Sequence, residues 1–286
     1  MEYVTLNNGI DMPKVGCGVY QVSPADCVRC VEDALHVGYR LIDTAQSYDN
    51  EYEVGTAIKE SGVRREDVFL TTKIWMNVSG YDRARQSIDD SLRRLQTDYV
   101  DLMLIHQPFG DYYGTYRAME EAYKEGKLRA IGVSNFFGDR LVDLCHNVEI
   151  IPAVDQVETH LFHQQKKLHQ VMERYGIVHE AWGPFAEGRK DFFSQPVLKA
   201  IGAAHHKTAA QAALRFLVQQ DIVVIPKSVH RDRMEQNLDI FDFTLTGEEM
   251  ERLSAFDSAD SAFFSHEDPD VVEQLYQMVA ARRLRA

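Results

Sequence analysis

Short hydrophobic runs rich in valine and isoleucine alternate with longer amphipathic segments along most of the chain. A short apolar run predicts a buried strand, and apolar residues three or four positions apart predict an amphipathic helix. Eight runs are predicted as strands, at residues 15–19, 41–45, 68–74, 100–105, 130–133, 153–157, 177–181 and 222–225. Helices are predicted to begin near Ala25, Glu51, Asp82, Thr115, Asp139, Gln164, Thr208 and Arg231, with a further short helix near Val197.

Strict alternation of eight strands with eight helices predicts an α/β fold closed into a parallel barrel, the (β/α)8 architecture. An open doubly wound sheet is the alternative arrangement, but eight repeats in 286 residues fit closure better. No linker or low-complexity segment interrupts the pattern, so we expect a single domain over residues 1–286. Before the repeat, Asn7-Asn8-Gly9 separates two short alternating segments and predicts a hairpin.

The end of the chain also lies outside the repeat. Thr246 and Glu249 form a capping box for another helix. An irregular acidic stretch at residues 257–270 then precedes a last helix that ends in Arg282-Arg283. This extension either folds over one mouth of the barrel and shapes a pocket, or lies on the surface as a strap.

Composition narrows the classes of function. The chain carries 44 acidic and 31 basic residues, a net charge of -13, which repels a phosphate backbone and argues against a nucleic-acid partner. No apolar window approaches the roughly 20 residues of a membrane helix, and residues 1–5 lack the features of a signal peptide. Four cysteines are too few for a disulfide framework in a chain of this length. We expect a cytoplasmic protein with no membrane partner.

Nearly every predicted strand stops at a polar or reactive residue. In a barrel these stops lie together at the C-terminal mouth, where barrel enzymes carry their active sites. A single histidine or aspartate at a strand end is usually a structural group, whereas seven such stops point to a functional site. They are Asp43, Lys73, His106, Ser134-Asn135, Gln156, Trp182 and Lys227-Ser228.

Four side chains at this mouth would activate a carbonyl group if they converge. A buried lysine is costly unless it is paired, and Asp43 on the neighbouring strand is the evident partner of Lys73. The positive charge favours ionisation of the Tyr48 phenol, whose ordinary pKa is about 10, and makes it a better proton donor. His106 would supply an N–H that polarises a carbonyl oxygen. Since no side chain supplies hydride, reduction of that carbonyl requires a nicotinamide cofactor.

Five longer motifs contain five of these seven strand ends. They are Gly38-Tyr39-Arg40-Leu41-Ile42-Asp43-Thr44-Ala45 with Tyr48 and Asn50-Glu51, Thr71-Thr72-Lys73-Ile74-Trp75, Leu104-Ile105-His106-Gln107-Pro108, Gly132-Val133-Ser134-Asn135-Phe136 and Ile225-Pro226-Lys227-Ser228. In this order they resemble the signatures of the aldo-keto reductases over nearly the whole chain, with the shorter bacterial-type diketogluconate reductases nearest in pattern. The resemblance implies a (β/α)8 TIM barrel that reduces aldehydes or ketones with NADPH, acts as a monomer, and uses the tetrad Asp43, Tyr48, Lys73 and His106.

The resemblance also implies a cofactor site and a substrate pocket. Ser134, Asn135 and Gln156 are implied to bind the nicotinamide carboxamide, and Trp182 to stack on its ring, which suits the chemistry of amides, hydroxyls and flat rings. Lys227, Ser228 and Arg233 match the binders of the 2′-phosphate, and Asn237 matches an adenine contact. Gly183 and Val229 complete the implied cofactor-binding set, and the implied substrate-binding residues are Tyr20, Trp75, His106 and Gln107.

The charges near the last strand favour NADPH over NADH. Lys227, His230, Arg231 and Arg233 form a basic cluster in an otherwise acidic chain, as expected where a dianionic phosphate binds at a helix start. The alternative, a solvated basic face of a helix, accounts for Arg231 better than for Lys227.

Five positions depart from the family pattern. Gln107 and Tyr20 stand where many relatives carry tryptophan, and Leu161 replaces a frequent proline. A less aromatic and more polar pocket fits a small aldehyde, dicarbonyl or keto-sugar better than a steroid. Asp155 stands where asparagine is usual, and Gln236 where glutamate is usual.

Three further motifs have structural explanations. Gly16-Cys17-Gly18 lacks the third glycine and the acidic residue of a dinucleotide-binding fingerprint. Cys27 and Cys30 fall on one helix without a second pair of ligands, so packing is the better interpretation. His205-His206 lacks a carboxylate ligand at a recognisable spacing, and we expect it to be exposed. We therefore expect no metal.

Two other functions stay open at this point. A lysine at a strand end is a nucleophile when its pKa is depressed, which would make Lys73 the Schiff-base residue of an aldolase, although Asp43 counts against this. A barrel that keeps a nucleotide site without turnover would be a non-catalytic NADPH-sensing module, which the complete tetrad disfavours.

Overall fold

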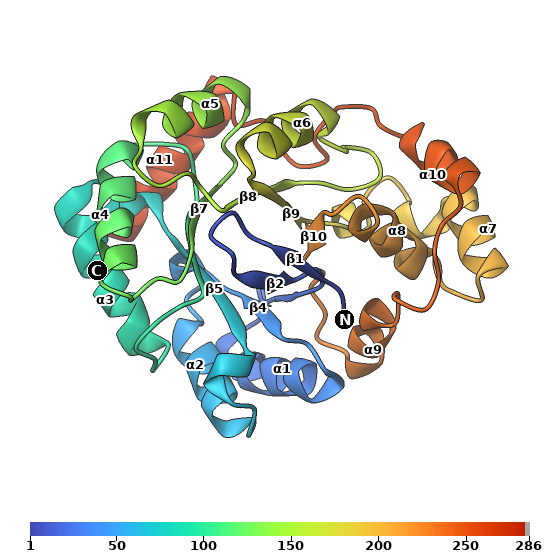
Figure 1. Cartoon of the computed structure of the whole chain (residues 1–286), viewed down its shortest axis with the longest axis horizontal. Helices are drawn as coiled ribbons and strands as arrows, with labels where there is room; N and C mark the ends of the chain where they lie inside the picture. The colour runs from blue at the N-terminus through green and yellow to red at the C-terminus, as the bar shows by residue number, and fades with distance from the viewer. Residues whose placement is uncertain (284–286) are drawn as a thin grey trace.

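Eight parallel strands form one curved sheet in the computed structural model, which describes residues 1–283 (Figure 1). Neighbours in the sheet follow chain order from β3 to β10, and every predicted strand is present. The strands are β3 (Cys17–Gly18), β4 (Leu41–Asp43), β5 (Phe69–Ile74), β6 (Leu102–Ile105), β7 (Ile131–Ser134), β8 (Val154–Glu158), β9 (Val178–Trp182) and β10 (Val223–Val224). The predicted (β/α)8 fold is confirmed.

The sheet closes on itself where its first and last strands meet. Val15 and Val224 form a parallel bridge. The Gly16 amide donates to the Val224 carbonyl at 2.8 Å, and the Val224 amide donates to the Lys14 carbonyl at 2.9 Å. A Cβ on Gly16 would lie only 2.4 Å from the Leu41 side chain. Close packing at this seam explains the glycine at this position and excludes the open doubly wound sheet.

Helices surround the sheet, and each predicted start lies within three residues of the observed one. The largest difference is at α4, where the Asp111 side chain accepts a hydrogen bond from the Gly114 amide and starts the helix earlier than the predicted Thr115. The helices are α1 (Pro24–Val37), α2 (Glu51–Glu60), α3 (Tyr81–Arg94), α4 (Tyr112–Lys124), α5 (Gly138–Asn147), α6 (Lys166–Tyr175), α7 (Pro196–Ala204), α8 (Ala209–Val218), α9 (Arg231–Leu238), α10 (Gly247–Ser254) and α11 (Pro269–Arg283).

Alternation along each strand decides which side chains face the barrel interior. In β4, Leu41 belongs to the hydrophobic cluster inside the barrel, whereas Ile42 packs among the strands and helices outside it. The next residue, Asp43, therefore faces inward. The same alternation in β5 turns Phe69 and Lys73 inward and Leu70 outward. Polar residues at the strand ends thus project into one mouth of the barrel.

The N-terminal hairpin covers the opposite end of the barrel. Its antiparallel strands β1 (Tyr3–Thr5) and β2 (Asp11–Pro13) lie in front of the sheet in Figure 1. Leu6 and Met12 of this hairpin pack against Leu41, Phe69 and Leu102, which begin their strands. The predicted hairpin is confirmed, and it seals the N-terminal end of the core.

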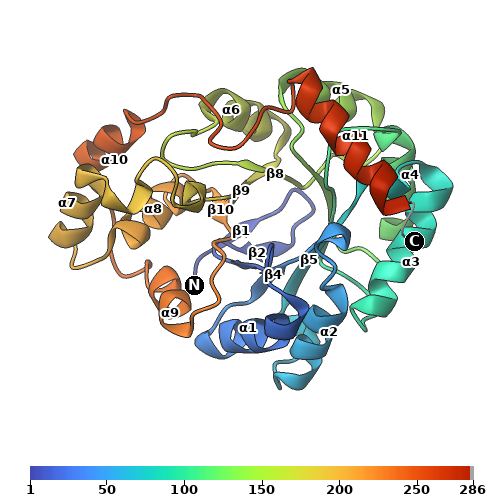
Figure 2. The ribbon, with the colours of Figure 1, turned by 180° about the vertical axis from the view of Figure 1, so that it is seen from behind.

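The C-terminal extension lies on the side of the barrel where the strands end. Figure 2 shows α11 crossing this side near α4 and α5. Leu275 and Val279 of α11 pack against Trp75, Met76 and Phe109, which follow β5 and β6. The extension therefore packs on the segments that follow β5 and β6, at the rim of this mouth, and is not only a surface strap.

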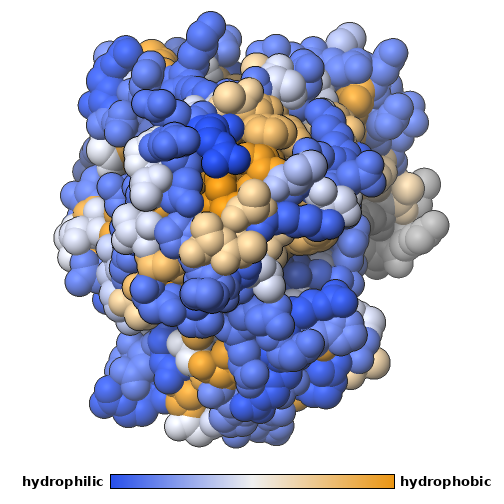
Figure 3. All heavy atoms as spheres, turned by 90° about the vertical axis from the view of Figure 1, so that its right-hand side faces the viewer, coloured by the Kyte–Doolittle hydropathy of each residue, from blue (hydrophilic) through white to orange (hydrophobic). Residues whose placement is uncertain are grey.

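The outer surface is largely polar. The side of the molecule that carries α7 and α10 is mostly hydrophilic, with a hydrophobic area near its middle (Figure 3). Among residues 1–283, no helix has the length and apolar character required to cross a membrane.

Candidate active site

Lys73 lies at the centre of the predicted tetrad and is fully buried. Its Nζ donates to Asp43 Oδ1 at 2.6 Å, to the Thr44 carbonyl at 3.0 Å and to the Tyr48 hydroxyl at 3.3 Å. Pairing between β4 and β5 places the two charged side chains on adjacent strands. The expected Asp43–Lys73 ion pair is therefore present, and Tyr48 contacts it directly.

The ion pair keeps Lys73 protonated. Burial opposes a charged amine, but the negative charge of Asp43 and its hydrogen bond to Lys73 outweigh burial and raise the pKa of Lys73. A Schiff-base lysine needs the opposite shift, because only the neutral amine attacks a carbonyl. The environment of Lys73 therefore disfavours the aldolase interpretation.

Tyr48 belongs to a short 3-10 helix, η1 (Gln46–Tyr48), that follows β4. Burial raises the pKa of Tyr48 to about 12, with the positive charge of Lys73 acting in the opposite direction. The expected lowering by Lys73 is thus present, but burial outweighs it. The phenol carries its proton at neutral pH, as a proton donor requires.

His106 follows β6 directly and borders Tyr48. Ser47 Oγ lies 3.3 Å from His106 Nδ1 and helps to fix the imidazole, a role that the sequence did not suggest. The His106 ring lies edge-on to Tyr48, with centroids 5.5 Å apart, and edge-on to Trp75 at 5.0 Å. All four residues of the tetrad therefore meet at the C-terminal mouth.

The predicted nicotinamide-binding residues form a connected group beside the tetrad. Asn135 has a positive φ of 63° after β7, and its Nδ2 donates to the His106 carbonyl at 3.1 Å and to Ser134 Oγ at 3.0 Å. Its Oδ1 accepts a hydrogen bond from the Trp182 indole at 2.9 Å. Ser134 Oγ donates to the Gln156 carbonyl at 2.7 Å. These bonds fix the indole in place next to polar groups that match a carboxamide.

Gln156 connects the tetrad to a carboxyl group that sequence reasoning did not single out. Its Nε2 donates to Asp43 Oδ2 and to Glu180 Oε2, each at 2.9 Å. Glu180 is fully buried in the middle of β9. A carboxyl group in the middle of a strand that begins and ends with apolar residues was the signal available in the sequence.

The basic cluster lies at the start of α9, after β10. Lys227 and Arg233 are exposed, and no ion pair holds either side chain within residues 1–283, whereas Arg231 pairs with Asp33 and Glu235. Ser228 Oγ donates to the His230 carbonyl and accepts from the His230 amide, both at 3.1 Å. Two exposed cations beside a helix start suit a phosphate group. Buried Asn237 and half-buried Val229 lie nearby in the chain.

Comparisons with known proteins agree with this geometry. The model of the aldo/keto reductase family matches residues 14–258. The chain belongs to this family. It is 45% identical over 256 residues to the glyoxal reductase of Bacillus subtilis, which covers 89% of this chain and 92% of that protein. It is 42% identical over 269 residues to the morphine 6-dehydrogenase of Pseudomonas putida, which covers 89% of this chain and 91% of that protein.

A solved structure shows the same fold. The aldo-keto reductase of Bombyx mori, determined in complex with NADP, is 32% identical with a TM-score of 0.87, covering 92% of this chain and 95% of that chain. The protein is an oxidoreductase that acts on carbonyl groups.

The predicted substrate side of this reductase consists of groups around Tyr48 and His106. The Tyr20 ring lies 5.0 Å from that of Tyr48 and is 52% exposed, so it borders the opening. Gln107 is buried, and its Oε1 lies 2.8 Å from His266 Nε2 in the C-terminal extension. His266, far along the chain, therefore contacts a predicted substrate-binding residue, and the sequence did not identify it.

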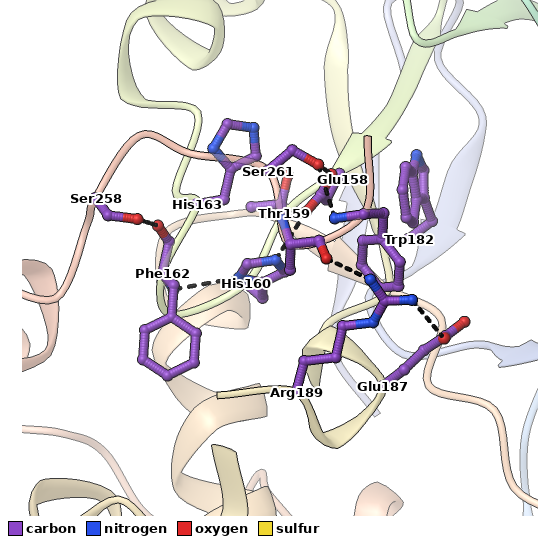
Figure 4. A network of polar contacts seen from close by, with 12 residues as sticks. Glu158, Thr159, His160, Phe162, His163, Trp182, Glu187, Arg189, Ser258 and Ser261 are labelled. Carbon is purple, nitrogen blue, oxygen red and sulfur yellow. Dashed lines mark hydrogen bonds and ion pairs between the residues drawn. The ribbon is translucent and has the colours of Figure 1, made fainter. Parts of the chain in front are cut away.

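Glu158, at the end of β8, anchors the extension (Figure 4). Its Oε2 accepts from Ser261 Oγ at 2.5 Å, and its Oε1 accepts from the Ala262 amide at 2.7 Å and lies 2.9 Å from His160 Nε2. Burial opposes ionisation of this carboxyl, but the hydrogen bonds from His160, Ser261 and Ala262 outweigh it and lower the pKa of Glu158. Arg189 donates to the Ala262 carbonyl at 2.5 Å from the other side.

The next residue of the extension touches the predicted nicotinamide platform. The Phe263 ring lies 5.2 Å from Trp182, and a Cβ added to Gly183, which has a φ of 61°, would lie 3.4 Å from the same ring. The positive φ of Gly183, and not a lack of space, therefore favours a glycine in the loop after β9.

The cysteine pair of α1 and His205 after α7 both have structural roles. Cys27 and Cys30 are buried in α1 as free thiols, which agrees with packing. The expected exposure of His205 is wrong, because the side chain is half-buried. Its Nε2 lies 3.0 Å from both carboxylate oxygens of Glu249, which is too distant in the chain for local spacing to reveal. Within residues 1–283, no group of three or more histidine, cysteine or acidic residues is arranged to hold a metal.

Proposed function

We propose that the protein uses NADPH to reduce small aldehydes, dicarbonyls or keto-sugars to alcohols within its one barrel domain, with Tyr48 as the proton donor. The observation that carries the proposal is the contact of the Tyr48 hydroxyl with Lys73 Nζ at 3.3 Å, where Asp43 holds the amine at 2.6 Å. A phenol beside a fixed positive charge donates a proton and is then stabilised as phenolate.

The residues of this chain fit a bound NADPH, which supplies hydride to the carbonyl carbon. Trp182, fixed by Asn135, offers a flat surface for the nicotinamide ring. Gln156 uses its Nε2 on Asp43 and Glu180, so its oxygen is left to accept from the carboxamide. Lys227 and Arg233 supply charge for a 2′-phosphate. The related Bombyx mori enzyme was solved with NADP, which supports the same cofactor here.

The proton moves from the Tyr48 oxygen to the carbonyl oxygen as the carbon receives hydride. His106 polarises the carbonyl by donating a hydrogen bond to the oxygen on which negative charge develops. Lys73 stabilises the resulting phenolate, and a proton from solvent restores the phenol. Every step uses a group that lies at the same mouth of the barrel.

The groups beside the tetrad favour a small polar substrate. Gln107 and His266 place a hydrogen-bonded polar pair where a steroid would need apolar contacts. The related Bacillus subtilis protein is a glyoxal reductase, which agrees with a dicarbonyl substrate, whereas the relative named morphine 6-dehydrogenase takes a larger molecule.

The proposal is tested by the loss of NADPH absorbance with methylglyoxal, a simple aromatic aldehyde and a diketo-sugar acid. We expect turnover with at least one of them, and a loss of about 100-fold or more in kcat for Tyr48→Phe with NADPH binding retained. Tyr52→Phe, an exposed tyrosine on α2, is the matched control and should keep the wild-type rate. Full activity of Tyr48→Phe would overturn the role of Tyr48.

A further inference from the structure

Glu180 is a buried carboxyl group inside the barrel that the proposed mechanism does not use. Its side chain has no exposed surface. Oε2 accepts a hydrogen bond from Gln156 Nε2 at 2.9 Å, and Oε1 has no hydrogen-bond partner within residues 1–283. A carboxylate in such a place loses water without full compensation, so its charged form is disfavoured.

A continuous line of contacts leads from Glu180 to Tyr48. Gln156 Nε2 joins Glu180 to Asp43 Oδ2 at 2.9 Å, and Asp43 Oδ1 holds Lys73 at 2.6 Å. Lys73 contacts the Tyr48 hydroxyl at 3.3 Å. A change of charge at Glu180 therefore acts on the group that gives and takes the catalytic proton.

Charge balance decides which carboxyl carries a proton. Asp43 and Lys73 are the charged side chains of the described residues that act on Glu180, and the Gln156 amide between them is neutral. One buried cation balances one buried anion, and a second anion would remain uncompensated. Asp43 touches Lys73 directly, whereas Glu180 is linked to Lys73 only through Gln156 and Asp43. Burial and the charge of Asp43 raise the pKa of Glu180 to about 8.

We propose that Glu180 is a positioning residue that holds the proton which keeps this buried cluster neutral, and that its ionisation makes Tyr48 hold its own proton more tightly. This inference rests on the proposed role of Tyr48. An added negative charge strengthens the hold of Lys73 on its proton and opposes formation of the Tyr48 phenolate. In alcohol oxidation, Tyr48 must accept a proton and therefore has to be ionised beforehand. Ionised Glu180 shifts the increase in the oxidation rate to higher pH.

The proton on Glu180 is observable without turnover. A buried protonated carboxyl has a distinct C=O stretching band in the infrared spectrum, and the difference between wild type and Glu180→Gln isolates the band of this residue. We expect the band at pH 6.5 and its loss as the pH rises through about 8. Absence of the band at pH 6.5 would overturn the inference whether or not Tyr48 is the proton donor.

The effect on Tyr48 is read from the pH profile of kcat/KM for oxidation of the alcohol product with NADP+ saturating. The amide that Glu180→Gln introduces keeps an acceptor for Gln156 but never ionises. The rising limb of the profile of this variant is expected about one pH unit lower than in wild type, the scale of shift caused by a nearby charge. Superimposable profiles would overturn the coupling.

Asp155→Asn is the matched control. Asp155 is also a fully buried carboxyl on β8, one residue before Gln156, but it faces the outer side of the barrel and no tetrad residue contributes to its ionisation. Its profile should follow wild type. An equal shift in this variant would assign the effect to altered packing of β8 and overturn the inference. The Tyr48→Phe assay separately reports failure of the proposed function.

Discussion

The imidazole Nε2 of His266 lies 2.8 Å from the amide oxygen of Gln107, which ties the C-terminal extension to the residue that follows His106. His266 is 4% exposed, and its ring lies 5.6 Å from that of Phe137 and 6.2 Å from that of Phe109. Burial lowers the pKa of His266 to about 4, so the ring is neutral at pH 7 and donates its Nε2 hydrogen to Gln107. The extension is thereby held over the pocket.

Removal of this contact should weaken substrate binding. For His266→Ala we expect KM for a small dicarbonyl to rise about fivefold, because a buried hydrogen bond contributes about 1 kcal/mol. His206→Ala, on an exposed histidine far from the pocket, serves as control. Steady-state kinetics with both variants checks this, and an unchanged KM in His266→Ala would show that the extension does not limit the pocket.

The exposed cations after β10 should select the phosphorylated cofactor. Arg233→Ala removes a charged donor, and we expect its Kd for NADPH to rise about tenfold while the Kd for NADH changes little. Arg231→Ala is matched to it on the same helix, since Arg231 already pairs with Asp33 and Glu235. Fluorescence titration with both cofactors measures the difference. Equal losses for NADPH and NADH in Arg233→Ala would contradict a phosphate-binding role.

Asp155 should make the fold less stable as the pH rises. Burial raises the pKa of Asp155 well above its usual range and outweighs an opposing hydrogen bond from the Phe136 backbone. The folded protein therefore keeps a proton that the unfolded chain loses above about pH 4. Folding stability falls as the pH rises from that value toward the folded pKa, by up to about 1.4 kcal/mol for each pH unit.

The substitution Asp155→Asn removes this pH dependence because the amide does not ionise. We expect the variant to be more stable than wild type at pH 8, with a gap that shrinks at pH 5. Thermal unfolding at both pH values measures it, and Glu60→Gln, on an exposed residue at the end of α2, is the control. A variant that loses stability at pH 8 would show that the Asp155 carboxylate is favourable in the folded protein.

Much of the barrel could be predicted because its strands are local features. Apolar runs, their spacing and the polar residues at their ends are all read within a few positions, and the Asp43–Lys73 pair followed from adjacent strands. Strand limits were less accurate: β8 continues past Gln156 to Glu158, and β10 ends three residues before Lys227. In β8 the extended backbone continues beyond the last apolar residue, Val157. In β10 the strand ends before the first cation, Lys227.

Contacts between distant parts of the chain could not be predicted. His266 and Gln107 are 159 positions apart, and Glu158 meets Ser261 across 103 positions. Their pairing depends on the path of an irregular segment that has no hydrophobic period. Glu180 was different, because its place in the middle of a predicted strand marked it as a candidate for burial. Only the inward orientation of Glu180 on β9 brings it to Gln156.

Hydride transfer to a carbonyl carbon within this barrel is the central claim, and isotope transfer tests it most directly. Methylglyoxal would be reduced by the enzyme with NADPH that carries deuterium at the transferable C4 position, and the alcohol examined by NMR. The account predicts deuterium on the former carbonyl carbon and a hydroxyl hydrogen from solvent, with product formation greatly reduced in Tyr48→Phe. Product without deuterium at that carbon, or no product from any of the three carbonyl compounds while NADPH is bound, would contradict it.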